Sequence, residues 1–409
     1  MTAVPDGWEQ HTPHEISGLE KRALVIGPFG SNLKTSDYRD EGVPLVFVKD
    51  IRARNFSSPR AYVSTVKAAE LGVHEVQPGD ILITKMGEPP GDVALYDADV
   101  PGIITADCIR LRPASGFDCR FLLHAFRTPA VRRQVNEITT GAAQQKVSLD
   151  RFRTRLHISA PPLAEQKRIA AVLDQVDILR AKRREAVTLL DDLAQSIFLD
   201  MFGDPVGIME KWPVEELGEV LEFLTSGSRG WAKYYTDSSG LLFLRIQNVK
   251  NGELHLEDIA YVDPPATKEA IRTRVKVGDV LLSITADLGR VAVVPSGMKG
   301  AHINQHLAIL RAPSYNSTFF AEFLSSPAGE RQIFGKNRQA VKAGLNFDDV
   351  RSLRIPAPSR DLQDRFELRL RAVRDLRKVH TTHLAALDEL FESVQQRAFA
   401  GKLWDHEAA

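Results

Sequence analysis

Two long segments of the chain carry apolar residues at alternating spacings of four and three, which predicts two helices that pack as a coiled coil. The seam of the first segment consists of Val172, Val176, Leu179, Arg183, Ala186, Leu190, Leu193 and Ile197. The seam of the second lies 197 residues later and consists of Arg369, Val373, Leu376, His380, His383, Leu387, Leu390 and Val394. A helix of about 35 residues is roughly 50 Å long, so the pair is expected to act as a spacer. The polar seam positions predict devices that set the register of the helices rather than a chemical site.

The second seam is one part of an internal duplication. Residues 79–82 (GDIL) recur as residues 278–281 (GDVL), 199 positions later, and both copies are typical of a turn that enters a buried strand. Residues 121–129 (FLLHAFRTP) match residues 319–327 (FFAEFLSSP) at a shift of 198. This match predicts two short helices in each half, with proline at the start of the second.

The duplication extends through the long helices, because residues 161–202 align with residues 358–399 at a constant shift of 197. We therefore expect an α+β fold class, with two mixed α/β domains in tandem, each followed by a long helix. Antiparallel pairing of the helices is favoured over parallel pairing, and it would relate the halves by a pseudo-twofold axis. The expected boundaries are 1–160 and 206–357 for the domains, and 161–205 and 358–409 for the helices.

The charge of the whole chain points to no class of partner, because 53 Lys and Arg residues balance 53 Asp and Glu residues. Any basic surface must therefore be local. Cys108 and Cys119 form no C-x-x-C pair, which argues against a disulfide framework and against structural zinc. The N-terminus lacks an apolar signal region, and no apolar run approaches the ~18 residues that span a bilayer. These features predict a cytoplasmic protein that does not enter a membrane.

Four short motifs resemble chemical sites without completing one. Residues 263–266 (DPPA) have alanine where a methyltransferase loop has the aromatic that stacks on a flipped base. Residues 27–32 (GPFGSN) lack the spacing of a nucleotide-binding loop. Residues 302–306 (HINQH) lack the glutamate of H-E-x-x-H and lie in a strand-like segment, and residues 165–167 (EQK) open a helix, where glutamate suits the dipole. We expect no catalytic residue, metal site or bound cofactor in this chain.

Three further motifs are more specific in combination. They are GPFGSNLKTSDY at residues 27–38, PPLAEQKRI at residues 161–169, and FGDP at residues 202–205 followed by Trp212-Pro213. With these motifs and its duplication, the chain resembles the specificity (S) subunits of Type I restriction-modification systems over nearly its whole length. One departure is residues 358–363 (PSRDLQ), which replace the P-P-L-x-E-Q pattern at the start of the first long helix.

The resemblance implies that each domain is a target recognition domain for one half of a split DNA sequence. It also implies that the two helices form an antiparallel spacer that docks two methyltransferase subunits, and that restriction subunits complete the assembly. S-adenosylmethionine, and ATP with Mg²⁺, are then expected on the partner subunits and not on this chain.

Contacts to double-stranded DNA need lysine and arginine near phosphates, and amides, arginines or carboxylates that reach base edges. We expect such residues in loop-like segments where the repeats diverge within a shared frame, as residues 49–50 (KD) and 247–248 (QN) do. The candidates in the first half are Ser31, Asn32, Lys34, Lys49, Asp50, Arg52, Lys85, Gln144, Gln145 and Lys146. The candidates in the second half are Ser228, Arg229, Gln247, Asn248, Lys250, Asn304, Gln305, Arg338 and Lys342. The expected target is asymmetric and bipartite.

The sequence leaves two other functions open. A coiled-coil scaffold with two protein-binding heads would show the same duplication, and salt-dependent binding to duplex DNA would distinguish the two, because phosphate contacts release counterions. A nuclease or methyltransferase acting alone would turn over DNA without partners, and only the incomplete motifs favour it.

Overall fold

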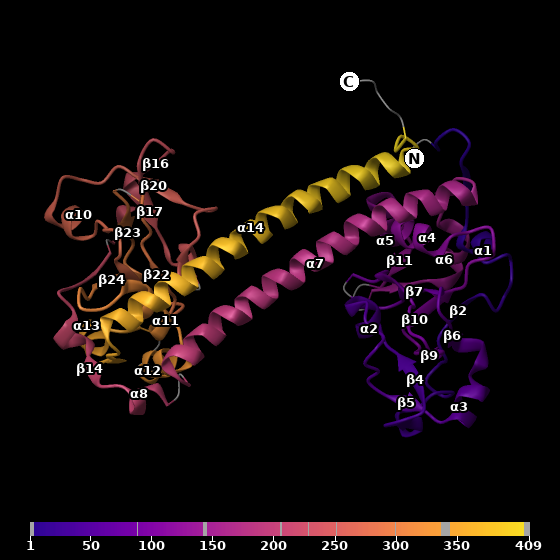
Figure 1. Ribbon diagram of the computed structural model, residues 1–409. Helices are drawn as coiled ribbons and strands as arrows, with labels where there is room; N and C mark the ends of the chain where they lie inside the picture. The colour runs from indigo at the N-terminus through magenta and orange to yellow at the C-terminus, as the bar shows by residue number, and fades with distance from the viewer. Residues whose placement is uncertain are drawn as a thin grey trace. The chain divides into compact units, whose positions relative to one another are not determined.

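The computed structural model describes residues 4–87, 89–141, 145–204, 207–227, 229–250, 252–298, 300–336 and 344–404. The chain divides into two compact units, each with one mixed α/β domain and part of each long helix (Figure 1). Unit 1 comprises Met1–Arg184 and Thr382–Ala409, and unit 2 comprises Glu185–Thr381.

A four-stranded antiparallel sheet with the order β2-β10-β7-β8 lies at the centre of unit 1. Its strands are β2 (Leu24–Ile26), β7 (Ile81–Thr84), β8 (Val93–Leu95) and β10 (Cys108–Leu111). The prediction of a turn before a buried strand is confirmed, since all four residues of β7 are buried. Asp80 in this turn accepts the backbone N–H of Gln77 at 2.9 Å and two hydrogen bonds from Arg112 at 2.7 and 2.8 Å. The buried carboxylate is therefore paired as the strand begins.

A second sheet of unit 1 has the order β3-β5-β4-β9-β6, with β4 and β9 parallel. Its strands are β3 (Tyr38–Arg39), β4 (Val43–Val46), β5 (Tyr62–Val63), β6 (Glu75–Val76) and β9 (Gly102–Ile104). Two smaller pairs join β1 (Glu9–His11) to β13 (Ile158–Ala160), and β11 (Thr139–Thr140) to β12 (Lys146–Val147). The β1–β13 pair closes the domain just before the first long helix begins.

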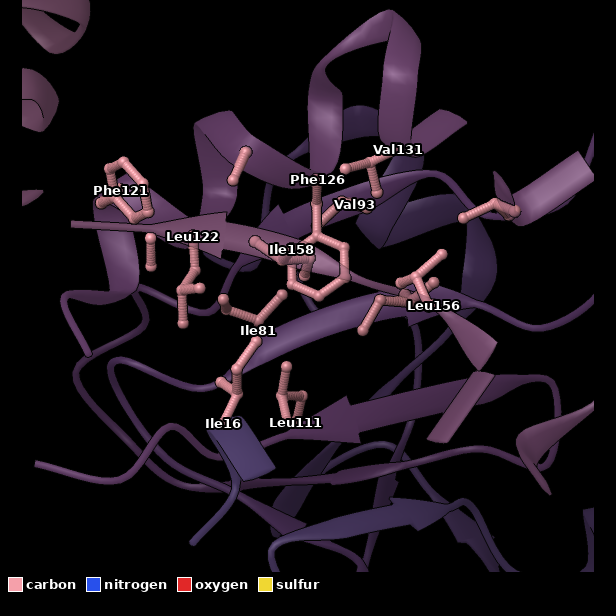
Figure 2. Close-up of a cluster of buried hydrophobic side chains, with 14 of the residues drawn as sticks. Ile16, Ile81, Val93, Leu111, Phe121, Leu122, Phe126, Val131, Leu156 and Ile158 are labelled. Atoms are coloured by element: carbon pink, nitrogen blue, oxygen red, sulfur yellow. The ribbon is translucent and has the colours of Figure 1, made fainter. Parts of the chain in front are cut away.

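The helices of unit 1 cover the central sheet and bury its apolar side chains. They are α1 (Pro13–Ile16), α2 (Val48–Ala53), α3 (Thr65–Glu70), α4 (Cys119–Arg127), α5 (Pro129–Ile138), α6 (Leu149–Arg155) and the 3-10 turns η1 (Thr35–Asp37) and η2 (Gly72–His74). Figure 2 shows Phe121, Leu122 and Phe126 of α4 in one cluster with strand residues such as Ile81 and Ile158. Proline is the first residue of α5, as predicted, and the side chain of Thr128 caps that helix.

Unit 2 repeats this architecture. Its central sheet has the order β15-β24-β21-β22 and a second sheet has the order β16-β20-β17-β23, in which β17 and β23 are parallel. The strands are β14 (Val214–Glu216), β15 (Phe223–Ser226), β16 (Tyr235–Thr236), β17 (Leu241–Leu244), β18 (Val249–Lys250), β19 (Glu253–Leu254), β20 (Ala260–Val262), β21 (Val280–Ser283), β22 (Val291–Val293), β23 (His302–Ile303), β24 (Leu307–Arg311) and β25 (Arg354–Pro356). Asp279 before β21 pairs with Arg311, which copies the arrangement of Asp80 and Arg112.

The helices of unit 2 follow the same order as those of unit 1. They are α8 (Ile208–Lys211), α9 (Leu217–Val220), α10 (Lys268–Arg272), α11 (Ser317–Leu324), α12 (Pro327–Gly335), α13 (Phe347–Arg351) and the 3-10 turns η3 (Trp231–Tyr234) and η4 (Ile246–Asn248). Proline again opens the second helix of the α11–α12 pair, and Ser326 caps it. The predicted helix pair is therefore confirmed in both halves.

The two long helices, α7 (Leu163–Phe202) and α14 (Arg360–Phe399), run antiparallel where they pair within each unit. In unit 1, Arg168 of α7 packs over Trp404 just after α14, whereas Arg180 packs over Phe391. In unit 2, Phe202 near the end of α7 contacts Phe366 near the start of α14, with ring centres 5.3 Å apart. Within the described part of the chain, no helix is both long and apolar enough to cross a lipid bilayer.

A buried glutamine anchors the start of each long helix to its own domain. Gln166 accepts the backbone N–H of Asp118 at 2.9 Å and donates to the carbonyl of Pro161 at 2.8 Å. Gln363 accepts the backbone N–H of Asn316 at 2.8 Å and donates to the carbonyl of Pro358 at 2.8 Å. The departure at residues 358–363 therefore leaves the anchoring side chain in place.

Most of the predicted apolar seam is correct. The buried or partly buried members are Val172, Val176, Leu190, Ile197, Val373, Leu387 and Val394. The prediction is wrong for Leu179, Leu193, Leu376 and Leu390, whose exposed fractions are 41, 45, 48 and 48%. The positions one residue later are buried or partly buried in their place: Arg180 and Ala194 in α7, and Arg377 and Phe391 in α14.

Arginine in the seam explains the error at Leu179 and Leu376, because the apolar spacing favours the leucine beside it. The Nε of Arg180 donates to the carboxylate of Asp388 at 2.6 Å, and its guanidinium lies 4.3 Å from the ring centre of Phe391. Arg377 donates to Asp191 at 2.6 Å. The two arginines are 197 residues apart, as are the two aspartates, so the ion pairs are copies of one interaction. An arginine can cover apolar surface with its stem while its charge reaches a carboxylate.

Candidate nucleic-acid interface

Two loops of unit 1 leave the central sheet at the same end. The antiparallel register pairs Ile26 with Ile109 and Thr84 with Cys108, so β2 and β7, which flank β10, end at the same edge of the sheet. The loop after β2 contains residues 27–34, and the loop between β7 and β8 contains residues 85–92. The sequence separates these loops by about fifty residues, and the sheet brings them together.

A third segment joins the same end through main-chain contacts. Met86 pairs with Lys146 in an isolated β-bridge, and the backbone N–H of Val147 donates to the carbonyl of Lys85 at 2.8 Å. The ammonium group of Lys85 lies 5.8 Å from the ring centre of Phe29, which is 67% exposed. The fold thus places the candidates Lys85 and Lys146 together, beside the loop that carries Ser31, Asn32 and Lys34, all exposed. Gln145 is exposed next to Lys146.

Glycine is required where the first of these loops crosses the sheet end. A Cβ atom on Gly27 would overlap the backbone carbonyl of Thr105, and one on Gly227 would overlap that of Asn304. Gly30, by contrast, has no atom near the position of its missing Cβ. The first glycine of the GPFGSN motif therefore permits a close main-chain crossing that both units share.

Helix α2 lies beside the loop at residues 85–92. The Nε of Arg52 donates to the carboxylate of Asp92 at 3.0 Å, and its guanidinium also reaches the carbonyl of Pro89 at 3.3 Å. Lys49 on the same helix is exposed. These contacts bring the candidates on α2 to the same set of loops as Lys85.

The structure corrects the roles expected for Asp50 and Asn248. Asp50 is 6% exposed, accepts the backbone N–H of Phe47 at 2.9 Å, and pairs with Arg60. Asn248 is 1% exposed, accepts the backbone N–H of Arg245 at 2.9 Å, and donates to two backbone carbonyls. Each side chain caps the start of its own helical turn, so neither is free to meet a base edge.

The candidates of unit 2 occupy equivalent loops. Arg229 is exposed in the loop after β15, and Lys250 is exposed on β18. Gln247 is exposed and donates to the Asp258 carboxylate at 3.2 Å. Asn304 is 9% exposed and accepts the backbone N–H of His306 at 3.2 Å, which makes it a turn residue and corrects its expected role.

Gln305 is partly buried in the same turn, and its amide lies 3.0 Å from the ring Nε2 of His306. The remaining candidates, Gln144, Ser228, Arg338 and Lys342, lie outside the described residues.

One basic residue of this surface was absent from the prediction. Arg151 lines a hollow in unit 1 with an open volume of about 310 Å³, together with Lys85, Lys146 and Ser148. It lies in α6 and not in a loop, so a search of loops passes over it. The sequence signal for Arg151 is its place three residues after Ser148, which caps α6. A side chain in the first turn of a helix lies near the loop that precedes the helix.

The two histidines of the HINQH segment have separate partners. His302 is buried, its Nδ1 is 3.3 Å from the hydroxyl of Thr273, and burial beside Arg274 lowers its pKa to about 4. The Nδ1 of His306 is 2.6 Å from the hydroxyl of Thr285. In the residues that the structure describes, no three His, Cys, Asp or Glu side chains are grouped to hold a metal ion.

Comparison with known proteins agrees with this duplicated architecture. Residues 54–189 match the family described as the Type I restriction modification DNA specificity domain. The chain is 22% identical to the Type I restriction enzyme EcoBI specificity subunit of Escherichia coli, with 98% of this chain and 88% of that protein covered. It is 25% identical to the EcoKI specificity subunit of Escherichia coli K12, with 98% and 90% covered.

A solved structure shows the same fold. The crystal structure of a Type I restriction-modification system S subunit from M. genitalium superimposes with a TM-score of 0.62, at 13% identity, over 98% of this chain and 97% of that one. The fold therefore defines a tandem α/β protein with an antiparallel helix pair. The family match over residues 54–189 and these two relatives make the chain similar to Type I restriction-modification specificity subunits over nearly its whole length.

Proposed function

We propose that this chain selects the DNA target of a Type I restriction-modification complex, with each unit binding one half of an asymmetric, bipartite duplex sequence. The supporting observation is that the two units share one fold but carry different exposed side chains at equivalent positions. Helix α2 presents an exposed lysine at position 49, whereas η4 presents an exposed glutamine at position 247. Because cations contact phosphates and amides discriminate base edges, such differences give the halves different preferences.

The long helices are proposed to dock two methyltransferase subunits, one beside each unit. Unit 1 exposes Leu179 and Leu390 on its helix segments, and unit 2 exposes Leu376 and Leu193. These leucines correspond at a shift of 197 residues, so each unit presents the same apolar pair. Equivalent exposed apolar side chains in the two units favour two copies of one partner. Restriction subunits are proposed to complete the complex, as the similarity to Type I specificity subunits implies.

The chemistry is proposed to reside on the partner subunits, with S-adenosylmethionine bound by the methyltransferase and ATP with Mg²⁺ by the restriction subunit. In this view the chain is not itself an enzyme. Purified chain with S-adenosylmethionine and duplex DNA should therefore transfer no methyl group until methyltransferase subunits are added. Turnover by the chain alone would contradict this part of the proposal.

An exchange of recognition domains tests the main proposal. Residues 16–160 are replaced by the corresponding segment of another specificity subunit, and methylated adenines are mapped in cells that contain the methyltransferase subunits. One half of the target should change while the half bound by unit 2 stays the same. A target unchanged in both halves would refute the role of unit 1, and a target changed in both would refute one half per unit.

A further inference from the structure

The hollow at the loop end of unit 1 is lined by three cations from separate segments. Lys85 follows β7, Lys146 lies in β12, and Arg151 lies in the first turn of α6. Thr140 and Ser148 add hydroxyl groups to the lining, and the open volume is about 310 Å³. A site that binds a phosphate group combines cations with hydrogen-bond donors around a hollow large enough to hold the group.

None of these three cations pairs with a carboxylate among the described residues, whereas several other cations of unit 1 do. Arg52 and Arg132 pair with Asp92, and Arg112 pairs with Asp80. The ammonium group of Lys85 instead lies over an aromatic ring, and the side chain of Lys146 is exposed. Three like charges around one hollow repel one another, and a bound anion would relieve that repulsion.

The three counterpart positions in unit 2, all of them described residues, carry no positive charge. The backbone N–H of Lys85 donates to the carbonyl of Asp107, and that of Ile284 donates in the same way to His306, so Ile284 is the counterpart of Lys85. Two isolated bridges, Met86 with Lys146 and Thr285 with Gly344, make Gly344 the counterpart of Lys146.

The last cation is replaced by an acid. Ser148 caps α6 by accepting the backbone N–H of Arg151, and Asn346 caps α13 by accepting that of Asp349. Asp349 is therefore the counterpart of Arg151. The shared frame carries Lys, Lys and Arg in one unit and Ile, Gly and Asp in the other, so the cations are not needed to build the fold.

We propose that the hollow lined by Lys85, Lys146 and Arg151 holds one backbone phosphate of the DNA duplex, and that the counterpart residues Ile284, Gly344 and Asp349 of unit 2 provide no such anchor. The inference rests on the proposed function, because it concerns the DNA that the chain selects. A phosphate contact positions a protein on the duplex and carries no sequence information. Unit 1 then holds its half of the target through a charge contact that is independent of the bases.

The test compares two double variants that each remove two lysine charges. Lys85→Gln with Lys146→Gln empties the hollow of both ammonium groups, whereas Lys21→Gln with Lys67→Gln removes two lysines elsewhere in unit 1. Each full-length chain is assembled with its methyltransferase subunits, and its Kd for target and non-target duplexes is measured between low and physiological salt. Thermal melting checks that both variants are folded.

The expected result for the hollow variant is roughly tenfold weaker binding at low salt, by about the same factor for both duplexes. The plot of log K against log salt should lose about one unit of slope, since each neutralised phosphate contributes about 0.9. The sequence methylated in cells should stay unchanged. Arg151→Gln alone should change affinity and slope in the same direction.

Three outcomes would overturn the inference. In the first, the hollow and control variants lose the same affinity and slope. In the second, the hollow variant methylates a different sequence, which would make these residues base-contacting. In the third, calorimetry shows that inorganic phosphate binds the wild-type chain and not the variant while DNA binding is equal, which would make the site one for a free anion. In each case wild-type target binding stands, whereas its absence would refute the proposed function.

Discussion

Replacing Gln166 with alanine should destabilise unit 1 by roughly 2–5 kcal/mol, because two buried main-chain groups lose their partners. The side chain is 2% exposed, accepts the N–H of Asp118 at 2.9 Å, and donates to the carbonyl of Pro161 at 2.8 Å. Each unsatisfied buried group costs about 1–3 kcal/mol, and the lost side-chain volume adds a cavity cost. The loss should fall on the junction between α4 and α7.

Amide hydrogen exchange is the suitable assay, because a chain of two units need not unfold in one transition. Amides of α4 should exchange at least about tenfold faster in Gln166→Ala, since 1.4 kcal/mol corresponds to a factor of ten. Amides of α11 in unit 2 should be unchanged. Gln363→Ala should instead accelerate exchange in α11 and leave exchange in α4 unchanged.

Gln175→Ala is the matched control, because Gln175 is exposed on the same helix. It should leave exchange in α4 close to wild type. Equal exchange in the Gln166 and Gln175 variants would show that the buried hydrogen bonds do not hold the helix, and would refute the reasoning.

Double-mutant cycles to alanine should give a larger coupling for Arg180–Asp388, about 1 kcal/mol, than for Arg377–Asp191, because the Arg180 side chain is 18% exposed and that of Arg377 is 42% exposed. Equal couplings would contradict this burial argument. His302 has a folded pKa of about 4, below its ordinary value near 6.5, so the unfolded chain binds more protons between these values. Unit 2 should therefore lose roughly 1–3 kcal/mol of stability as the pH falls from about 6.5 to 4, and His302→Asn should flatten that dependence in urea unfolding at several pH values. An unchanged slope in the variant would exclude His302 as its source.

The sequence alone was enough to establish the duplication. The repeated GDIL segment, the proline-opened helix pair and the constant shift through both long helices all correspond to matching elements in the two units. These features depend on local spacing and on comparison of one segment with another, and neither needs knowledge of distant contacts. The alternate seam positions Val176 and Val373 were correct for the same reason.

Only the tertiary structure decided the remaining seam positions. Spacing from Val176 allows the next seam residue to lie three or four positions later, and hydrophobicity favoured Leu179 over Arg180. The seam admits Arg180 because Asp388, more than two hundred residues away in the sequence, accepts its charge.

The candidate interface divides in the same way. Loop position and residue type found Lys85 and Lys146, but the sequence could not show that Asp50 and Asn248 cap their own helical turns, or that Arg151 meets the two lysines. A polar side chain is free to bind DNA only if no backbone group has already taken its hydrogen bonds. The path of the main chain in the folded protein determines which polar side chains bind the backbone. The repeat in the sequence indicates only the positions at which polar side chains occur.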